Sequence, residues 1–235
     1  MRIICLLTFL VLLTTSCNSP AAISTPAPTI SPSTEGEVTM KLPSVRCDSN
    51  VSLEKTLLER RSVRDYADAP LTLEELSQLL WACQGITNSI GFRTAPSAGA
   101  LYPLEVYAVV GNVKDLAAGI YRYEPEGHQI TRTTAGDKRS QLADSALGQS
   151  MIEGGAVSFV ITAVYERTTG KYGERGIRYV HMEVGHAGQN LCLEAVALGL
   201  GAVTVGAFYD DEVAKVLKLS ENEEPLYIIS VGRKK

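Results

Sequence analysis

The longest regular pattern in the sequence runs from about residue 175 to residue 199. Apolar side chains recur there three or four positions apart, at Ile177, Val180, Val184, Ala187, Leu191, Ala195 and Leu198. This spacing places them on one face of an α-helix. A second apolar face of the same helix holds Met182, Leu193 and Val196. We therefore expect a long helix over residues 175–199 that is buried on most sides.

Shorter helix and strand patterns lie on both sides of this run. The spacing of apolar residues predicts helices over residues 52–59, 72–84, 137–147 and 212–219. Thr72 and Glu75 stand three apart at the start of the second of these, which is the spacing of a capping box. Apolar and β-branched runs predict strands over residues 104–110, 157–164, 202–208 and 225–231, and a hairpin over residues 119–133. This mixed order, with no internal repeat, predicts the α+β class.

The composition fits one folded domain. The chain has 235 residues, of which 45% are hydrophobic, and this is enough for one sizeable core. Its net charge is -4 and its pI is about 5.5, which gives no general attraction to nucleic acid. We therefore expect no nucleic-acid partner, and any basic site has to be local.

The first 42 residues do not fit the pattern of that domain. Residues 3–13 form a nearly unbroken apolar run, too short to span a bilayer, and small residues lead from it to Cys17. The pattern is similar to a bacterial lipoprotein signal over residues 1–17 with Cys17 lipidated, and an ordinary secretory signal is the alternative. Residues 18–42, rich in Ser, Thr and Pro, predict a disordered tether, and residues 43–235 form the expected domain. We expect an exported protein, held on the extracytoplasmic side of the membrane by a lipid anchor only.

Several common catalytic motifs are missing from the sequence. It has no P-loop and no GxSxG nucleophile motif. His181 and His186 stand five apart on the predicted long helix, and no cysteines have metal-ligand spacing, so we expect no metal site. Cys83 and Cys192 lie in apolar helical patterns and are predicted to be buried thiols. A chain of this kind is expected to take its chemistry from a bound cofactor.

Basic residues gather in one short segment, Glu59-Arg60-Arg61-Ser62-Val63-Arg64-Asp65-Tyr66. In an extended chain, side chains two positions apart face the same way, so Arg60, Ser62 and Arg64 would converge on one point. Two guanidinium groups and a hydroxyl group suit a phosphate group. The alternative is a solvated basic turn that follows a short helix.

A loop of small residues lies between two prolines, Pro96 and Pro103. Small residues allow the backbone to approach a flat ligand closely, and backbone amides can then bond the heteroatoms of a ring. A plain turn between a helix and a strand is the alternative.

Taken in order, four segments resemble the nitroreductase family, and within it the SagB/ThcOx-type dehydrogenases. They are Arg60 to Tyr66, Ala95 to Pro103, Arg178-Tyr179 through Glu183-x-Gly185-His186-x-x-Gln189-Asn190, and Gly199-Leu200-Gly201 with Val205-Gly206-Ala207-Phe208. The closing residues Ser230 to Arg233 also fit, and the match covers about residue 45 to the C-terminus. The resemblance implies a nitroreductase-like α+β fold with a mixed, mainly antiparallel central sheet flanked by helices. It also implies a homodimer that binds FMN at the subunit interface.

The resemblance further implies roles for individual residues. The FMN phosphate and ribityl chain would be held by Arg60, Ser62 and Arg64, with Arg61 as a further candidate. The loop against the flavin ring would consist of Pro96, Ser97, Ala98 and Gly99. Backbone amides near flavin N5 would come from Gly206 and Ala207, and a late basic residue that assists the phosphate would be Arg233. The chain departs from other members at Ala100 and Tyr102, where Asn and Gln are frequent.

A Lys-Tyr pair, Lys171 and Tyr172, stands just before the predicted long helix. In the azoline-oxidising members of the family, a pair in the matching place is proposed to remove a proton while flavin takes the hydride. A lysine can act as a base, and a tyrosine can hold or relay the proton. A solvated pair in a loop is the alternative.

These observations support two hypotheses of function. The first is an FMN-dependent oxidoreductase that transfers a hydride through flavin N5, with a nitroaromatic, a quinone or a peptide heterocycle as substrate. The second is a non-catalytic flavin- or peptide-binding lipoprotein that keeps the fold. They differ in whether bound flavin is reduced and turns over.

Overall fold

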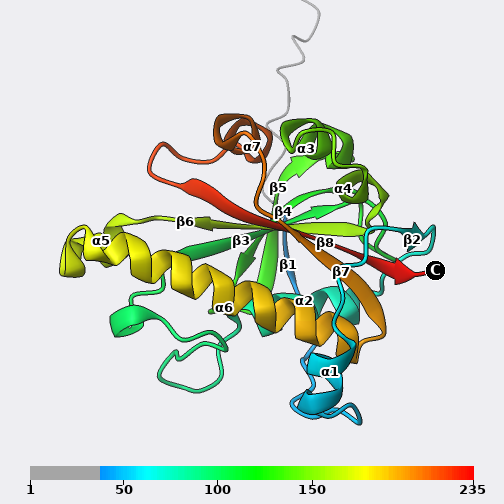
Figure 1. Cartoon of the computed structure of the whole chain (residues 1–235), viewed down its shortest axis with the longest axis horizontal. Coiled ribbons are helices and arrows are strands. Elements are labelled where there is room, and N and C mark those ends of the chain that lie inside the picture. The colour runs from blue at the N-terminus through cyan, green and yellow to red at the C-terminus, as the bar shows by residue number, and fades with distance from the viewer. Residues whose placement is uncertain (1–37) are drawn as a thin grey trace, which may run out of the picture. The chain divides into compact units, whose positions relative to one another are not determined.

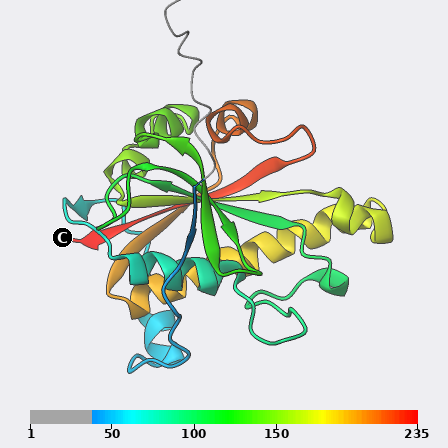
Figure 2. The ribbon, with the colours of Figure 1, turned by 180° about the vertical axis from the view of Figure 1, so that it is seen from behind.

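A computed structural model describes residues 38–235 of the chain (Figure 1). One eight-stranded sheet forms the middle layer, in the order β1-β5-β4-β3-β6-β8-β2, and β7 also pairs with β8. The pairings between these strands are antiparallel. Helices α2 and α6 cover one face of the sheet, and α3, α4 and α7 cover the other (Figures 1 and 2). The expected α+β fold with a mainly antiparallel central sheet is confirmed.

The strands are β1 (Val38–Lys41), β2 (Tyr66–Ala67), β3 (Leu104–Val110), β4 (Gly119–Glu124), β5 (Gln129–Ala135), β6 (Val157–Ala163), β7 (Leu200–Val205) and β8 (Glu224–Lys234). Strand β6 is buried along its whole length because helices cover both faces of the sheet. Strand β7 begins two residues before its expected start, at Leu200, and ends at Val205. As a result, Gly206 and Ala207 lie in the loop that follows the strand.

The first strand changes one expected boundary. Residues Val38–Lys41 of β1 pair with β5, although residues 18–42 were predicted to form a disordered tether. The folded domain therefore begins by Val38 and not at residue 43. The predicted signal over residues 1–17, its Cys17 and the rest of the tether lie outside the described residues.

The helices are α1 (Leu53–Glu59), α2 (Leu73–Gln84), α3 (Arg139–Ser145), α4 (Ser150–Gly154), α5 (Glu166–Tyr172), α6 (Arg175–Ala197) and α7 (Asp210–Leu217), with a short 3₁₀ turn, η1 (Ala98–Ala100). The capping box of α2 is confirmed. The hydroxyl oxygen of Thr72 accepts a hydrogen bond from the Glu75 amide at 3.2 Å, and Glu75 Oε2 accepts one from the Thr72 amide at 2.7 Å. Helix α5 was not expected. Among the helices of residues 38–235, none combines the length and the hydropathy needed to cross a bilayer.

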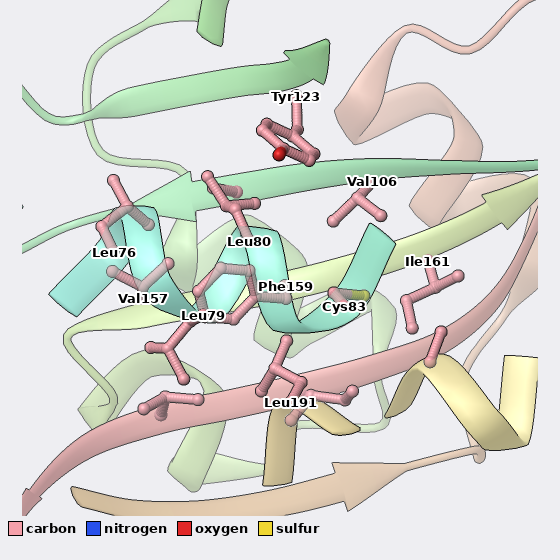
Figure 3. Close-up of a cluster of buried hydrophobic side chains, with 14 of the residues drawn as sticks. Leu76, Leu79, Leu80, Cys83, Val106, Tyr123, Val157, Phe159, Ile161 and Leu191 are labelled. Atoms are coloured by element: carbon pink, nitrogen blue, oxygen red, sulfur yellow. The ribbon is translucent and has the colours of Figure 1, made fainter. Parts of the chain in front are cut away.

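A hydrophobic core fills the space between the sheet and the helix layer that contains α2 and α6 (Figure 3). Leu76, Leu79 and Leu80 of α2 pack there with Phe159 of β6 and Leu191 of α6. The two cysteines predicted to be buried thiols, Cys83 and Cys192, belong to the same core and are free, which confirms the prediction. A second cluster lies on the opposite face, between the sheet and the helices α3, α4 and α7.

Helix α6 has one buried side and one exposed side. The side toward the sheet is buried at Val180, Val184, Ala187, Leu191 and Ala195. On the outer side, Ile177 is 43% exposed and Met182 is 54% exposed. The single chain thus leaves apolar surface on the outer side of a helix that the sequence predicted to be buried on most sides.

Candidate functional site

The arginine segment leaves α1 in an extended conformation along the start of β7. Ser62 forms a parallel bridge with Ala202, and the Val63 amide donates to the Ala202 carbonyl oxygen at 2.9 Å. Val63 also packs on Gly201, where a Cβ atom would lie 2.7 Å from Val63 Cγ1. Neighbouring side chains of an extended segment face opposite ways, so Ser62 and Arg64 are exposed while Val63 packs inward. The segment thus has the extended conformation that the convergence of Arg60, Ser62 and Arg64 requires.

Two of the arginines in this segment keep their charge available. Arg60 and Arg64 take part in none of the ion pairs within residues 38–235. Arg61 instead turns back to the end of α1, where its Nη1 donates to the carbonyl oxygens of Leu58 and Arg60 at 2.9 and 2.7 Å. These carbonyls have no partner inside the helix, so Arg61 caps it. Within residues 38–235, Arg60 and Arg64 therefore have no carboxylate partner, whereas Arg61 caps α1.

Arg233, at the end of β8, also has a partner inside the protein. Its two terminal nitrogens donate to the two carboxylate oxygens of Glu75 at 2.7 Å, and its Nε donates to the Pro70 carbonyl oxygen at 3.2 Å. Glu75 is the acidic member of the α2 capping box, so this bidentate pair joins β8 to the first turn of α2. The geometry gives no support to the predicted role of Arg233 at a phosphate group.

The loop that contains Pro96, Ser97, Ala98 and Gly99 continues in an unusual backbone conformation. The φ angles of Gly99, Ala100 and Tyr102 are 66°, 54° and 46°. Residues other than glycine rarely adopt this region, and such strain is concentrated at ligand sites. Neighbouring contacts hold the loop in place: the Tyr102 amide donates to Ser97 Oγ at 3.0 Å, and the Arg93 guanidinium lies 4.5 Å from the centre of the Tyr102 ring.

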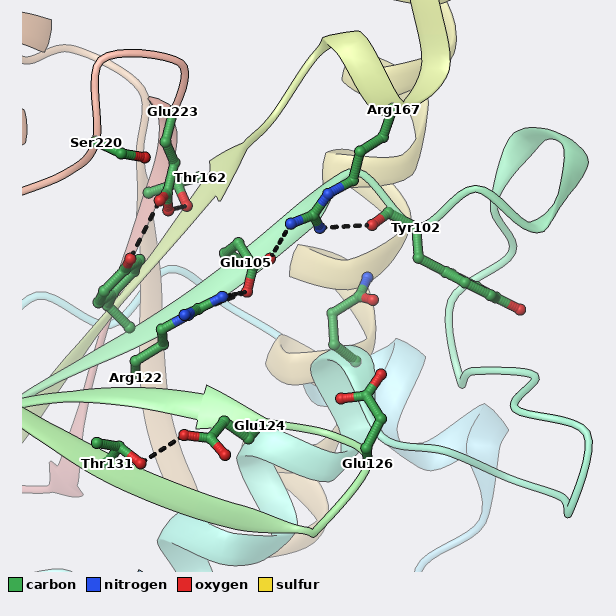
Figure 4. A network of polar contacts seen from close by, with 12 residues as sticks. Tyr102, Glu105, Arg122, Glu124, Glu126, Thr131, Thr162, Arg167, Ser220 and Glu223 are labelled. Carbon is green, nitrogen blue, oxygen red and sulfur yellow. Dashed lines mark hydrogen bonds and ion pairs between the residues drawn. The ribbon is translucent and has the colours of Figure 1, made fainter. Parts of the chain in front are cut away.

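The Lys-Tyr pair lies directly against this loop, at the C-terminal end of α5. A Cβ atom at Gly99 would be 2.8 Å from Tyr172 Oη and 3.0 Å from Lys171 Nζ. A larger residue at this position would displace the ends of both side chains, and its φ of 66° also favours glycine. Arg167 of α5 donates to the carbonyl oxygen of Tyr102 at 3.1 Å, which fixes the helix on the loop (Figure 4). The structure thus brings together two segments that the sequence analysis singled out separately.

Glu183 of α6 is a buried acid that the sequence analysis did not assign to the site. It is 2% exposed, and its Oε1 has no hydrogen-bond partner within the described residues. Burial raises its pKa to about 7, while the nearby side chains of Ser97 and Arg93 act in the opposite direction. The sequence contained a sign of this burial. Glu183 stands three positions after Val180, so the helical spacing places it on the apolar side of the helix.

Gly206 and Ala207 are exposed in the loop after β7. Gly206 lines an open cavity of about 330 Å³, together with His181, Val184 and Gly185 of α6 and Leu226 and Tyr227 of β8. The carbonyl oxygen of Ala207 accepts a hydrogen bond from Gln149 Nε2 at 2.9 Å, which holds the loop in place. The cavity therefore places exposed backbone next to apolar side chains, as a flat ligand requires.

Two of the predicted segments lie near opposite ends of α6 (Figure 1). The arginine segment lies beside Gly201 and Ala202, just after the C-terminal end of the helix. Gly99 lies against Lys171 and Tyr172, just before its N-terminal end. The 23 residues of α6 span about 34 Å, so the two groups are well separated within one chain.

Known proteins of similar sequence and structure identify the family of this chain. Residues 57–233 match the model of the Nitroreductase family. The chain belongs to the nitroreductase family. A family member from Methanocaldococcus jannaschii is 51% identical over 184 residues, which cover 78% of this chain and 92% of that protein. The solved structure of a family member from Ralstonia eutropha shares 30% identity at a TM-score of 0.74, and the match covers 84% of this chain and 90% of that one.

A further relative is named as a microcin-processing protein. The microcin B17-processing protein McbC of Escherichia coli is 31% identical over 134 residues. This match covers 55% of the nitroreductase-family chain described here but only 49% of McbC. The shared part includes about half of each protein, so the similarity shows a common domain and leaves the two activities to be compared by experiment.

Proposed function

We propose that this nitroreductase-family oxidoreductase uses FMN to transfer a hydride to a small quinone, a nitroaromatic compound or a peptide heterocycle. The observation that carries the proposal is that Arg60 and Arg64, two positions before and after Ser62, take part in none of the ion pairs within residues 38–235. An extended backbone fixed on β7 holds all three. Charged donors of this kind bind phosphate oxygens strongly. Bound FMN supplies the hydride chemistry that the side chains lack.

The other residues of the site have roles that fit a flat cofactor. The exposed backbone of Gly206 and Ala207 would face the ring, beside the cavity of about 330 Å³. The loop from Pro96 to Gly99 would cover the ring from another side, because Gly99 has no side chain to keep a ligand away. Lys171 and Tyr172 sit on that loop, where they would hold or move a proton of the substrate.

The separation of the two groups along α6 supports a homodimer. One chain holds its phosphate-binding residues and its loop near opposite ends of a helix of about 34 Å. We infer that the loop of one copy meets the arginine segment of the other. Exposed apolar residues support an interface on this side: Ile177 and Met182 on α6, and Leu57 and Leu58 on α1, are between 43% and 72% exposed.

Titration of the purified protein with FMN, followed by flavin fluorescence, tests the phosphate site. Replacing Arg60 or Arg64 by alanine removes charge-assisted hydrogen bonds worth roughly 1.5–3 kcal/mol, so we expect FMN to bind about 10- to 100-fold more weakly. Arg61→Ala is the matched control, because it removes the same charge from the same segment but breaks only contacts to backbone carbonyls. A wild-type protein that binds no FMN would contradict the proposal, as would equal losses in all three variants.

The alternative function, a carrier that binds flavin or peptide without turnover, predicts a different kinetic result. Bound FMN, once reduced chemically, would then be reoxidised by quinones and nitroaromatic compounds no faster than free FMN. The oxidoreductase proposal predicts faster reoxidation by at least one of these classes. Stopped-flow absorbance measurements at the flavin band distinguish the two outcomes.

The location of the protein is a separate proposal. We infer from residues 1–17 that the chain is exported and anchored by a lipid on Cys17, with the folded domain outside the cytoplasm. Labelling cells with a radioactive fatty acid tests this directly. The chain should carry the label, and Cys17→Ser should lose it; label on both forms, or on neither, would contradict the inference.

A further inference from the structure

Tyr165 and His181 form a polar pair beside the cavity that Gly206 lines. Tyr165 Oη lies 2.7 Å from His181 Nε2, and the two rings meet edge to face at 85° with their centres 5.8 Å apart. Tyr165 stands between the end of β6 and the start of α5, and His181 lies on the outer side of α6. The contact therefore joins two elements at the rim of the cavity. The sequence analysis treated His181 only as one of two histidines that make a poor metal pair.

The surroundings of His181 suggest a chemical role. The cavity walls otherwise consist of bare backbone at Gly185 and Gly206, aliphatic side chains at Val184 and Leu226, and the ring of Tyr227. Among these lining residues, histidine is the side chain that both releases and accepts a proton near neutral pH. A substrate in this cavity would have His181 on one side and the exposed backbone of Gly206 on another.

We propose that His181 is a proton-transfer residue of this cavity and that Tyr165 is its positioning residue. The inference rests on the proposed function, because the hydride equivalent has to come from a reduced flavin. Reduction of a quinone to a hydroquinone takes up one hydride equivalent and one proton. The imidazolium of His181 gives the proton to a quinone oxygen, becomes neutral and regains a proton from solvent. Charge and atoms then balance over the cycle.

Tyr165 can hold the imidazole in both protonation states. Because Nε2 of His181 is bonded to Tyr165, the proton leaves from Nδ1. The phenol oxygen accepts from the Nε2–H both before and after the transfer, so the hydrogen bond survives it. Burial raises the pKa of Tyr165 to about 12, and Glu224 and Asp210 act in the same direction. The hydroxyl therefore stays protonated through the range in which histidine titrates.

Other charged groups also lie near the pair. On the outer side of α6, a second open cavity groups His181 with Glu174, Arg175 and Arg178. From β8, Tyr227 lines the first cavity together with His181. Replacing His181 alone leaves these groups in place, so the difference between variant and wild type isolates the imidazole.

His186 provides a matched control on the same helix. It is exposed, stands five positions after His181 and is not among the residues that line the cavity. The variants to compare are His181→Gln, Tyr165→Phe and His186→Gln. Tyr165→Phe keeps the edge-to-face ring contact and removes only the hydroxyl group.

The kinetic test reoxidises chemically reduced, FMN-loaded protein with a fully substituted, water-soluble benzoquinone, which does not add to thiols. We expect His181→Gln to slow reoxidation about 10- to 100-fold and to remove one ionisation from its pH profile, in line with general acid catalysis. We expect Tyr165→Phe to shift that ionisation and to slow the reaction less. His186→Gln should match the wild type. Unchanged kinetics in His181→Gln would overturn the proposal.

A binding test separates this proposal from the assignment of FMN. The same quinone is added to the protein without flavin, and the imidazole signals of His181 and His186 are followed by NMR. The proposal predicts that the His181 signals move and that the His186 signals stay. If the NMR signals of His181 do not move when quinone is added, the proposed role of His181 is overturned, even if the protein binds FMN. If the His181 signals move but the protein takes up no FMN, only the proposed function is contradicted.

Discussion

Replacing Glu183 by glutamine should make the protein more stable at alkaline pH. Glu183 is 2% exposed, and its Oε1 has no partner within residues 38–235. Burial raises its pKa in the folded protein from 4.5 to about 7. Each unit of pKa difference corresponds to about 1.4 kcal/mol, so ionising this group in the folded state costs about 3 kcal/mol. Glutamine keeps the shape of the side chain and never ionises.

The direction of the effect follows from proton binding. Between pH 4.5 and about pH 7 the unfolded chain has released the proton of Glu183 while the folded protein still holds it. The stability that the protonated group contributes is therefore complete below pH 4.5 and is lost as the pH rises to about 7. The Glu183→Gln variant should match the wild type near pH 4.5 and exceed its free energy of unfolding by about 3 kcal/mol above pH 8.

Urea denaturation of both proteins at several pH values measures this difference. His128 and Glu194 also have shifted pKa values, so they too make the stability of the wild type depend on pH. Because both groups are present in both proteins, the difference in free energy of unfolding between variant and wild type reports Glu183 alone. Glu153→Gln, which removes an exposed carboxylate from α4, controls for the loss of one negative charge. A stability difference between Glu183→Gln and wild type that stays constant from pH 4.5 to above pH 8 would refute the reasoning.

Three further predictions concern the loop, its Lys-Tyr pair and Arg233. Gly99→Ala should destabilise the protein by about 1 kcal/mol and slow turnover, because alanine at a φ of 66° is strained and its Cβ meets Tyr172 and Lys171. Thermal denaturation and turnover assays measure the two effects, and finding neither would contradict this prediction. Lys171→Ala should keep FMN affinity but reduce turnover at least about tenfold, and unchanged turnover would remove Lys171 from the mechanism. Arg233→Ala should lower the free energy of unfolding by about 1–3 kcal/mol, since it leaves the Glu75 carboxylate without its bidentate partner. The affinity for FMN should stay the same, and a large loss of affinity would indicate that Arg233 does bind the phosphate group.

Elements with strong local signals could be predicted from the sequence. The capping box at Thr72 and the apolar spacing that follows it depend on neighbouring residues only, and α2 begins where they indicate. The hairpin of β4 and β5 and the long helix α6 also have local patterns. Helix α5 does not. Its sequence lacks apolar periodicity, and contacts such as that of Arg167 with the Tyr102 carbonyl hold it in place.

The strand β7 shows how glycines can mislead. The expected helix over residues 175–199 ends at Gly199, and the structure agrees, because Gly199 follows the last turn of α6 with a φ of 73°. The strand, however, was expected to begin only at residue 202, after Gly201. Gly201 instead lies inside the strand, because the side chain of Val63 occupies the space that a Cβ atom would need. This requirement comes from a segment far away in the sequence, so no local pattern reveals it.

The sequence indicated which residues belong to the candidate site, but it did not show which hydrogen bonds and ion pairs these residues form. The arginine segment, the loop near Gly99 and the Lys-Tyr pair were each identified from the sequence. That Arg61 caps α1 and that Glu75 binds Arg233 depends on distances between atoms, which composition does not contain. Likewise, apolar spacing on α6 does not distinguish residues buried in the core from residues such as Met182 that face a second copy in our proposal.

A complementation experiment tests the central claim, that two copies of the chain build each FMN site together. One copy carries Arg60→Ala with Arg64→Ala, the other carries Gly99→Val, and the two are co-expressed with different tags and purified as a mixed dimer. Neither variant alone should bind FMN tightly. The mixed dimer should bind one FMN, because one of its two sites combines the intact arginine segment of one copy with the intact loop of the other. A mixed dimer that binds no FMN would contradict the account.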